Sequence, residues 1–147
     1  MQKPQRIILA SDISGLGKVA VTAALPLFAI CQLEVAVLPT VLLSSHTGGF
    51  SDVFIEDYTS GMQAFLKQWQ SIGVEFSALV TGYLKSSQQI ASLIDFLEHE
   101  NLPLIVDPIM GDNGELYKGF GDHYISSMRT LCQKADLAQF NRSLFSC

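Results

Sequence analysis

The stretch LIVDPIMGDNGELY, from Leu104 to Tyr117, joins a short apolar strand to a loop that carries two acidic residues. Residues 104–106 have the composition of a buried strand, and Asp107 stands where that strand ends. Asp112 follows in a loop that contains glycine. Because a buried carboxylate without a partner is costly, we expect a positively charged group close to Asp107. The stretch therefore predicts a strand end that carries a polar site.

Apolar runs of this kind alternate with amphipathic segments along the whole chain. We expect strands at residues 6–10, 35–43, 76–81 and 104–106, and helices at 19–32, 58–72, 86–100 and 122–134. Alternation of strands and helices predicts right-handed crossovers and a parallel sheet covered by helices on both faces. The fold class we predict is therefore three-layer α/β/α.

Length and composition agree with this fold class. With 147 residues the chain is long enough for one domain with a hydrophobic core and too short for two domains. We assign residues 1–137 to that domain, or to part of a larger domain. Hydrophobic residues make up 48% of the chain, and the mean hydropathy is +0.30. Such values favour a sheet that is buried on both faces.

Charge and cysteine usage exclude several classes of function. The net charge is -5, without a cluster of Lys and Arg, so we expect no nucleic-acid partner. The uncharged run 19–33 is too short to span a bilayer, and residues 7–10 are too short for a signal-peptide core, so we expect no membrane association. The three cysteines form no CxxC pair, which favours free thiols in the cytoplasm.

Polar residues cluster directly after each expected strand. Asp12 and Ser14 follow the first strand, residues 44–47 the second, 81–83 the third and 107–112 the fourth. Ligands of open parallel sheets bind beyond the carboxyl ends of the strands. We call this side of the sheet the carboxyl edge, and we predict a small-molecule site there.

The segment GLGKVA, residues 15–20, matches the G-x-G-x-x-A form of a dinucleotide fingerprint. The acid that should bind a ribose at the end of the second strand is missing, and the phosphate-loop pattern also fails. Two interpretations remain open: a glycine turn that brings a ligand close to backbone N–H groups at a helix start, or an ordinary tight turn.

The candidate side chains also have structural explanations. His46, in SSHTGG at a strand end, suits a ligand contact or a structural role equally well, and no residue set has the spacing of a permanent zinc site. Asp107 and Asp112 suit Mg²⁺ held partly by water and phosphates. An ordinary turn would explain Asn113 beside Gly114, but it would not explain Asp107.

Three segments together resemble the pyridoxal kinases of the ribokinase-like superfamily: SSHTGGF at 44–50, TGYLKSSQQI at 81–90 and VDPIMGDNGELY at 106–117. The resemblance extends over about residues 7–137 and implies the N-terminal half of a ribokinase-like fold. It implies a cytoplasmic, typically homodimeric enzyme of vitamin B6 salvage. Such an enzyme uses ATP and Mg²⁺ to phosphorylate the 5'-hydroxymethyl group of pyridoxal, pyridoxine or pyridoxamine.

The resemblance also implies roles for individual residues. His46, Thr47 and Tyr83 match positions that line the vitamin pocket. Asp12 stands where many relatives have a serine that contacts the pyridine ring, so its role departs from the pattern. Asp107 and Asp112 match acids near the metal and the ATP phosphates, with Asp107 on the metal. The positive partner expected for Asp107 is then a metal ion with its nucleotide.

The catalytic base of the resembled family has no counterpart in this sequence. That base is an aspartate in a late glycine-rich segment such as GTGD, so we assign no catalytic residue and expect the chain alone to be inactive or nearly so. The chain is about half the length that the resemblance implies. Without further strands, its sheet should keep an open edge and apolar faces, and we expect association in solution.

The final residues, 138–147, read AQFNRSLFSC, whereas relatives continue with ITPNLTEA. Under one permitted choice of codons, the same bases read one position later encode PNLTEACFL. We therefore predict a frame-shifted tail, which the DNA sequence around codon 138 would test.

Two other functions stay open at this stage. One is a hydroxymethylpyrimidine kinase of thiamine synthesis, which the segment DISGLG favours and SSHTGG disfavours. The other is a non-catalytic fragment that binds a small ring compound or a partner chain.

Overall fold

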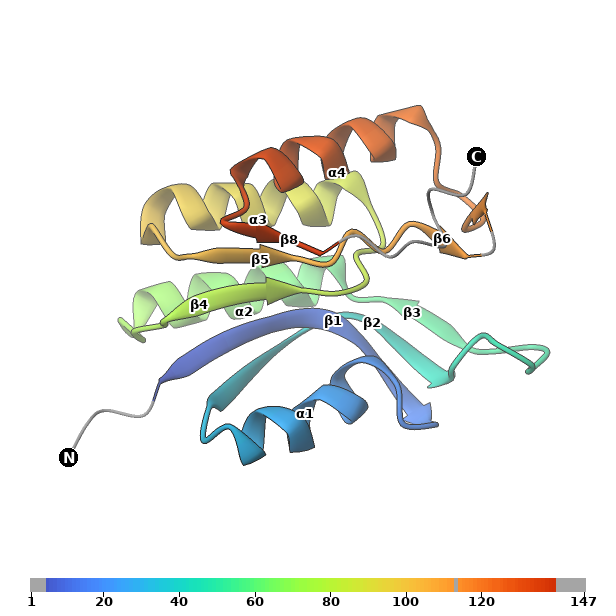
Figure 1. Cartoon of the computed structure of the whole chain (residues 1–147), viewed down its shortest axis with the longest axis horizontal. Helices are drawn as coiled ribbons and strands as arrows, with labels where there is room; N and C mark the ends of the chain where they lie inside the picture. Colours follow the sequence, from blue (N-terminus) through green and yellow to red (C-terminus); the bar gives the residue numbers. More distant parts are fainter. Residues whose placement is uncertain (1–4, 113, 140–147) are drawn as a thin grey trace.

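A computed structural model describes residues 5–112 and 114–139, which form a six-stranded sheet between helices (Figure 1). The strand order is β3-β2-β1-β4-β5-β8, parallel throughout except for the antiparallel edge strand β3. The strands are β1 (Arg6–Leu16), β2 (Glu34–Ser45), β3 (Ile55–Asp57), β4 (Ala78–Thr81), β5 (Leu104–Val106) and β8 (Leu137–Ala138). A separate hairpin consists of β6 (Gly111–Asp112) and β7 (Glu115–Leu116).

The helices are α1 (Ala20–Ile30), α2 (Thr59–Ser71), α3 (Ser87–Glu100) and α4 (Asp122–Lys134). In Figure 1, α2, α3 and α4 lie over one face of the sheet, and α1 lies on the opposite face. The predicted three-layer α/β/α fold is therefore confirmed, although the antiparallel strand β3 was not predicted. Among the described residues, no helix has both the length and the apolar character that crossing a bilayer requires.

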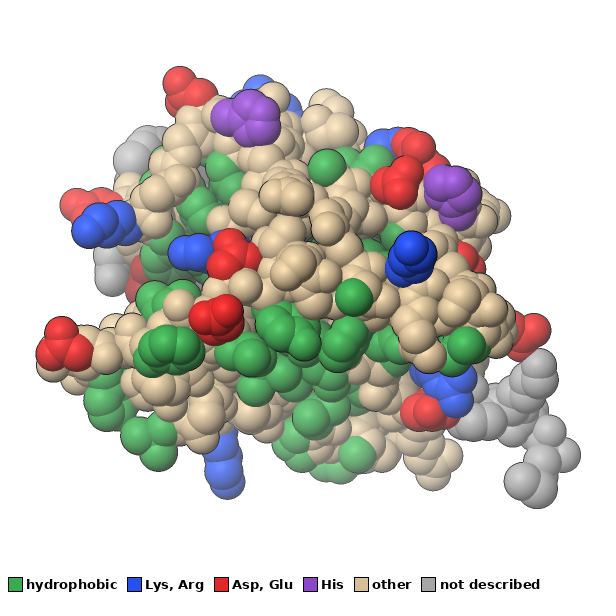
Figure 2. Space-filling view, turned by 180° about the vertical axis from the view of Figure 1, so that it is seen from behind, with side chains coloured by type: hydrophobic (Ala, Val, Ile, Leu, Met, Phe, Trp, Pro, Cys, Tyr) green, Lys and Arg blue, Asp and Glu red, His purple; other side chains and the backbone are tan. Residues whose placement is uncertain are grey.

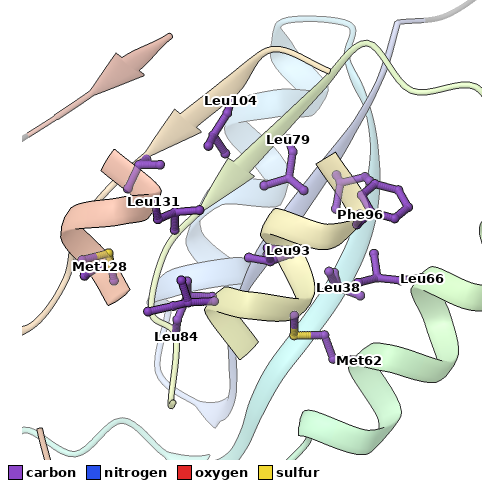
Figure 3. Packing of buried hydrophobic residues seen from close by; sticks show 14 of the residues in the cluster. Leu38, Met62, Leu66, Leu79, Leu84, Leu93, Phe96, Leu104, Met128 and Leu131 are labelled. Carbon is purple, nitrogen blue, oxygen red and sulfur yellow. The ribbon is translucent and has the colours of Figure 1, made fainter. Parts of the chain in front are cut away.

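The main core lies between the sheet and the three helices on its larger covered face. Figure 3 shows Leu38, Leu79 and Leu104 from three strands close to the side chains of these helices. Leu93 of α3 and Leu131 of α4 are fully buried in the same cluster. Alternate residues of each strand point into this core, as the two-residue period of a strand requires.

Helix α3 shows how local sequence sets the bounds of an element. The hydroxyl of Ser86 accepts a hydrogen bond from the backbone N–H of Gln89 at 3.3 Å and so caps the first turn. Asn101 ends the helix in the left-handed conformation, with φ 49°. Ile90, with other apolar residues at helical spacing, is buried against the sheet. The helix predicted at 86–100 is thus confirmed.

Helix α1 is shorter than the helix predicted at 19–32, and it exposes apolar side chains that were expected to be buried. It contains no charged residue, and it continues through Pro26, whose side chain is exposed. Leu27 is 64% exposed and Ile30 is 79% exposed. The apolar composition that predicted a buried helix therefore leaves part of α1 uncovered.

The first strand is longer than predicted, and this is the main correction to the fold. The segment SDISGLGK was expected to be a glycine-rich turn, but β1 continues through it as far as Leu16. A shift of register between Ser11 and Ile13 lets β1 stay paired with β2 up to Ser45. The turn is confined to the residues that follow Leu16.

Other strand bounds differ by smaller amounts. The third predicted strand begins at Ala78 and not at Phe76, whose ring packs against Trp69 and Phe96. The strands β3, β6, β7 and β8 have two or three residues each and, unlike β5, contain no run of three apolar residues that would predict a strand.

Strand β8 also changes the expected end of the domain. Ala138, assigned to the tail, pairs in parallel with Val106 of β5. The sheet therefore does not end at the fourth predicted strand, and the proposed boundary after residue 137 falls inside a strand. The rest of the predicted frame-shifted tail, from residue 140, lies outside the described residues.

Candidate functional site

The irregularity in β1 places two polar residues at the carboxyl edge of the sheet. Ser11 is 4% exposed and Asp12 is 9% exposed. The Ser11 hydroxyl donates to Asp12 Oδ1 at 3.1 Å and accepts from the backbone N–H of Tyr83 at 3.3 Å. The N–H of Gly82 donates to the carbonyl of Ala10 at 2.8 Å. These bonds fix the loop after β4 against β1.

An aromatic cluster extends from this loop. We use this name for Tyr83, Tyr117, Phe120 and Tyr124. The ring of Tyr83 stacks on Phe120 with centroids 5.9 Å apart. The ring of Tyr117 meets the Tyr83 ring edge-on, with centroids 6.1 Å apart. Phe120 stacks on Tyr124 at 3.7 Å, and the Tyr124 hydroxyl donates to the carbonyl of Leu84 at 2.7 Å. The cluster forms an apolar wall beside the Asp12 carboxylate, suited to one face of a flat ring.

Electrostatic interactions join the cluster to the acids. Burial raises the pKa of Asp12, and the hydrogen bond from Ser11 opposes this rise. The pKa of Tyr83 is raised by burial first and then by the charge of Asp12. The pKa of Tyr117 is raised by burial, by Asp112 and by Asp12. The structure thus brings together three of the predicted site residues, Asp12, Tyr83 and Asp112.

Asp107 lies next to this group, at the end of β5. Its N–H donates to the carbonyl of Thr81 at 3.1 Å, and its half-buried carboxylate has a pKa raised by desolvation. In the described part of the chain, no cationic side chain forms an ion pair with it. The expected positive partner is therefore not supplied by these residues.

The acids fit a cation only in part. Within residues 5–112 and 114–139, no group of three or more His, Cys, Asp or Glu side chains could hold a metal ion. The desolvated carboxylate of Asp107 and the exposed Asp112 suit Mg²⁺ whose other ligands are phosphate oxygens and water. Two carboxylates alone do not complete the octahedral coordination that Mg²⁺ prefers.

His46 and Thr47 lie at the end of β2, away from these contacts. The His46 ring lies against Gly17 and meets Phe50 edge-on at 4.9 Å. Thr47 is exposed. The described contacts do not connect either residue to Asp12 or Tyr83. Their predicted role in substrate binding stays a prediction.

The interpretation of GLGKVA as a ligand-binding turn loses support. Gly15 lies inside β1, beside the Ser44 carbonyl, and of the two glycines in this segment Gly17 alone has a positive φ, +98°. A Cβ atom at Gly17 would lie 2.6 Å from Cδ2 of His46. Close packing of this histidine and the required φ explain the glycine without a ligand.

Two of the polar residues that the sequence placed after its expected strands, Ser14 and Thr81, have buried hydroxyls. The hydroxyls of Ser14 and Thr81 are buried without a hydrogen-bond partner in the described structure. Ser11, Tyr117 and Phe120, in contrast, were not predicted as site residues. A buried hydroxyl without a partner is costly, so both are candidates for a bound ligand or water.

Replacing Asp107 with asparagine should stabilise the protein at neutral pH. A carboxyl group whose folded pKa lies above its ordinary value of 3.8 contributes stability at low pH, and that contribution is lost as the pH rises through the folded pKa. Asp107→Asn should therefore raise the melting temperature at pH 7 and have little effect at about pH 3. Thermal melts across this range test it, with the exposed Glu56→Gln as control. A lower melting temperature at pH 7 would contradict the desolvation of Asp107.

Comparison with known proteins shows which proteins the chain is similar to. No protein-family model matches it. In an alignment 97 residues long, which covers 57% of this chain, it is 31% identical to a candidate pyridoxal kinase (BUD17) from Saccharomyces cerevisiae, of which the match covers 29%. Its structure matches a candidate phosphomethylpyrimidine kinase from Bacteroides thetaiotaomicron with TM-score 0.91 and 34% identity, over 97% of this chain and 50% of that one. The pyridoxal kinase from Lactobacillus plantarum gives TM-score 0.90 and 33% identity, over 95% and 51%.

These likenesses define the class first: the chain has the fold of the ribokinase-like kinases, and it spans about half the length of these solved relatives. Within that class it is pyridoxal kinase-like in both sequence and structure. The predicted resemblance is thereby confirmed.

Proposed function

We propose that the chain is the substrate-binding half of a kinase that phosphorylates a vitamin B6 vitamer with ATP. The observation that carries the proposal is the Ser11 hydroxyl at the carboxyl edge, which bonds both to the buried Asp12 carboxylate and to the backbone of Tyr83, a member of the aromatic cluster. A crystal form of the Bacteroides protein, 34% identical to this chain, was solved with pyridoxal. That ligand is a flat aromatic ring with polar groups at its rim.

Asp12 would recognise the ring and the aromatic cluster would hold it. A carboxylate can accept a hydrogen bond from a ring N–H or from a hydroxyl group, and such charge-assisted bonds contribute about 1.5–3 kcal/mol. The aromatic walls of Tyr83 and Tyr117 exclude water from one side of the ring. The unpaired hydroxyls of Ser14 and Thr81 offer further polar contacts nearby.

Asp107, at the end of β5, and Asp112, in the hairpin that follows, would hold the metal side of the site. When bound, Mg²⁺ neutralises charge on the transferring phosphate. A pyridoxal kinase from Leishmania donovani, 20% identical and so informative on the fold alone, was solved with ADP and pyridoxamine. Because no residue of this chain is assigned as the base, we expect no phosphoryl transfer by the chain alone.

Titration of the chain with pyridoxal tests the binding part of this proposal. Asp12→Asn should weaken binding about 10-fold or more, because it removes the charged acceptor while keeping the shape. Glu98→Gln, at an exposed salt bridge on α3, is the matched control and should bind like the original chain. Calorimetry measures both affinities. Equal affinity of Asp12→Asn and the control would remove Asp12 from the site.

The rival substrate is a hydroxymethylpyrimidine, which the name of the Bacteroides relative favours. An aminopyrimidine can donate its amino group to Asp12, so the same site could accept it. Tighter binding of 4-amino-5-hydroxymethyl-2-methylpyrimidine than of pyridoxal in the same titration would decide for this rival. Binding of neither compound would leave a fragment with another ligand.

A further inference from the structure

One part of the sheet face that α1 occupies has no cover among the described residues. Register pairs Leu9 of β1 with Val80 of β4, Val80 with Ile105 of β5, and Ile105 with Leu137 of β8. These four residues form one apolar row across four parallel strands. They point away from the main core, because their neighbours along each strand point into it.

Exposure increases along this row with distance from α1. The helix packs on β1 and β2, where Leu9 is only 5% exposed. Val80 and Ile105 are half-buried, and Leu137 is 58% exposed. We call Val80, Ile105 and Leu137 the open face. Parallel sheets are normally covered on both faces, so this surface lacks part of its layer.

The open face continues into an open sheet edge. In the described structure, β8 pairs with β5 on one side and is the last strand of the sheet. An edge strand with unpaired N–H and C=O groups can accept a further strand. A single partner that adds both a strand and a covering helix would satisfy the edge and the face together.

The relatives indicate what that partner is. Both solved relatives reported above have about twice the matched length, since the chain covers 50% and 51% of them. We propose that the open face and the edge of β8 dock a polypeptide equivalent to the half of a pyridoxal kinase-like chain that this chain does not match. A second copy of this chain is the competing occupant, and the oligomeric state of the chain alone distinguishes it from this partner.

The protein also exposes apolar side chains that do not belong to the open face. Figure 2 shows the molecule from behind, with hydrophobic side chains gathered in a band across the lower half of that side. Exposed apolar residues away from the open face include Ile72, at the end of α2, which is 60% exposed. Ile72 therefore provides a control for general stickiness.

The test co-expresses this chain with the unmatched half of the Bacteroides protein as a separate polypeptide, so that each half can fold on the other, and circular dichroism checks that the purified material is folded. Light scattering after size exclusion should show a one-to-one complex. Leu137→Asp and Ile105→Asp should each weaken binding at least 10-fold, whereas Ile72→Asp should leave it unchanged. Because Leu137 is exposed, the Leu137→Asp variant should still fold, and it tests the docking proposal even if Ile105→Asp does not fold. Circular dichroism melts measure whether each variant is folded.

Two results would overturn the docking proposal. One is the absence of a complex, or a complex that Leu137→Asp leaves intact. The other is a dimer of this chain alone that Leu137→Asp abolishes, which would assign the face to a second copy. The proposal rests on the family likeness and not on the substrate. Since the measurement of the complex needs neither pyridoxal nor ATP, its failure is separate from failure of the proposed function.

Discussion

Gln89→Leu is expected to lower the free energy of unfolding by about 3 kcal/mol, a large part of the 5–15 kcal/mol typical of a domain. Gln89 is fully buried on α3. Its Nε2 donates to the carbonyl of Thr40 at 2.8 Å and to Thr59 Oγ1 at 3.0 Å, and its Oε1 accepts from the N–H of Lys85 at 2.8 Å. One amide thus joins β2, α2 and the loop after β4 to α3.

The leucine variant has a similar size but no polar group. The Lys85 N–H would lose its acceptor, and an unsatisfied buried donor costs about 1–3 kcal/mol before the other lost bonds are counted. Urea unfolding of the variant and of Gln88→Leu, at the exposed neighbouring position, measures the difference. Equal stability of the two variants would show that the Gln89 bonds contribute little.

The sequence predicted those features that are set locally or by long patterns. Helix α3 has a capping serine, an asparagine at its end and apolar residues at helical spacing, so its bounds followed from the chain itself. Strand β5 was predicted with the observed bounds because three apolar residues lie between turn residues. Both elements keep in the structure the conformation that their own residues favour.

The missed features depend on partners far away in the sequence. The second half of β1 contains glycines and polar residues, and it is a strand because β2 pairs with it as far as Ser45. Strand β8 has two residues and exists because β5 offers an edge. Propensity alone cannot predict such elements, since the pairing partner supplies the stabilisation.

The candidate site was predicted in part for the same reason. Asp12 and Tyr83 could be placed at strand ends, so their common location on the carboxyl edge followed from the topology. Tyr117 and Phe120 belong to the loop after Asp107, and only the folded chain shows that their rings meet Tyr83. Ser11 was assigned to a turn, which hid its bond to Tyr83.

Gly82→Ala is expected to abolish measurable pyridoxal binding, because Gly82 is the point of contact between the loop after β4 and β1. A Cβ atom there would lie 2.4 Å from the Ser11 hydroxyl oxygen and 3.0 Å from Ser11 Cβ. Ser11 is buried and bonded on both sides, to Asp12 and to the N–H of Tyr83, so it has little room to move. The alanine would therefore push the loop away from β1.

That displacement separates the two groups that we expect to contact the ring. The Tyr83 ring would shift relative to the Asp12 carboxylate, and overpacking of this kind also costs about 1–3 kcal/mol of stability. Gly121→Ala is the matched control, because no atom lies within 4 Å of a Cβ built there. Calorimetric titration with pyridoxal should show binding by Gly121→Ala and none by Gly82→Ala, at a temperature where melts show both folded. Undiminished binding by Gly82→Ala would mean that the ligand does not lie between Asp12 and Tyr83.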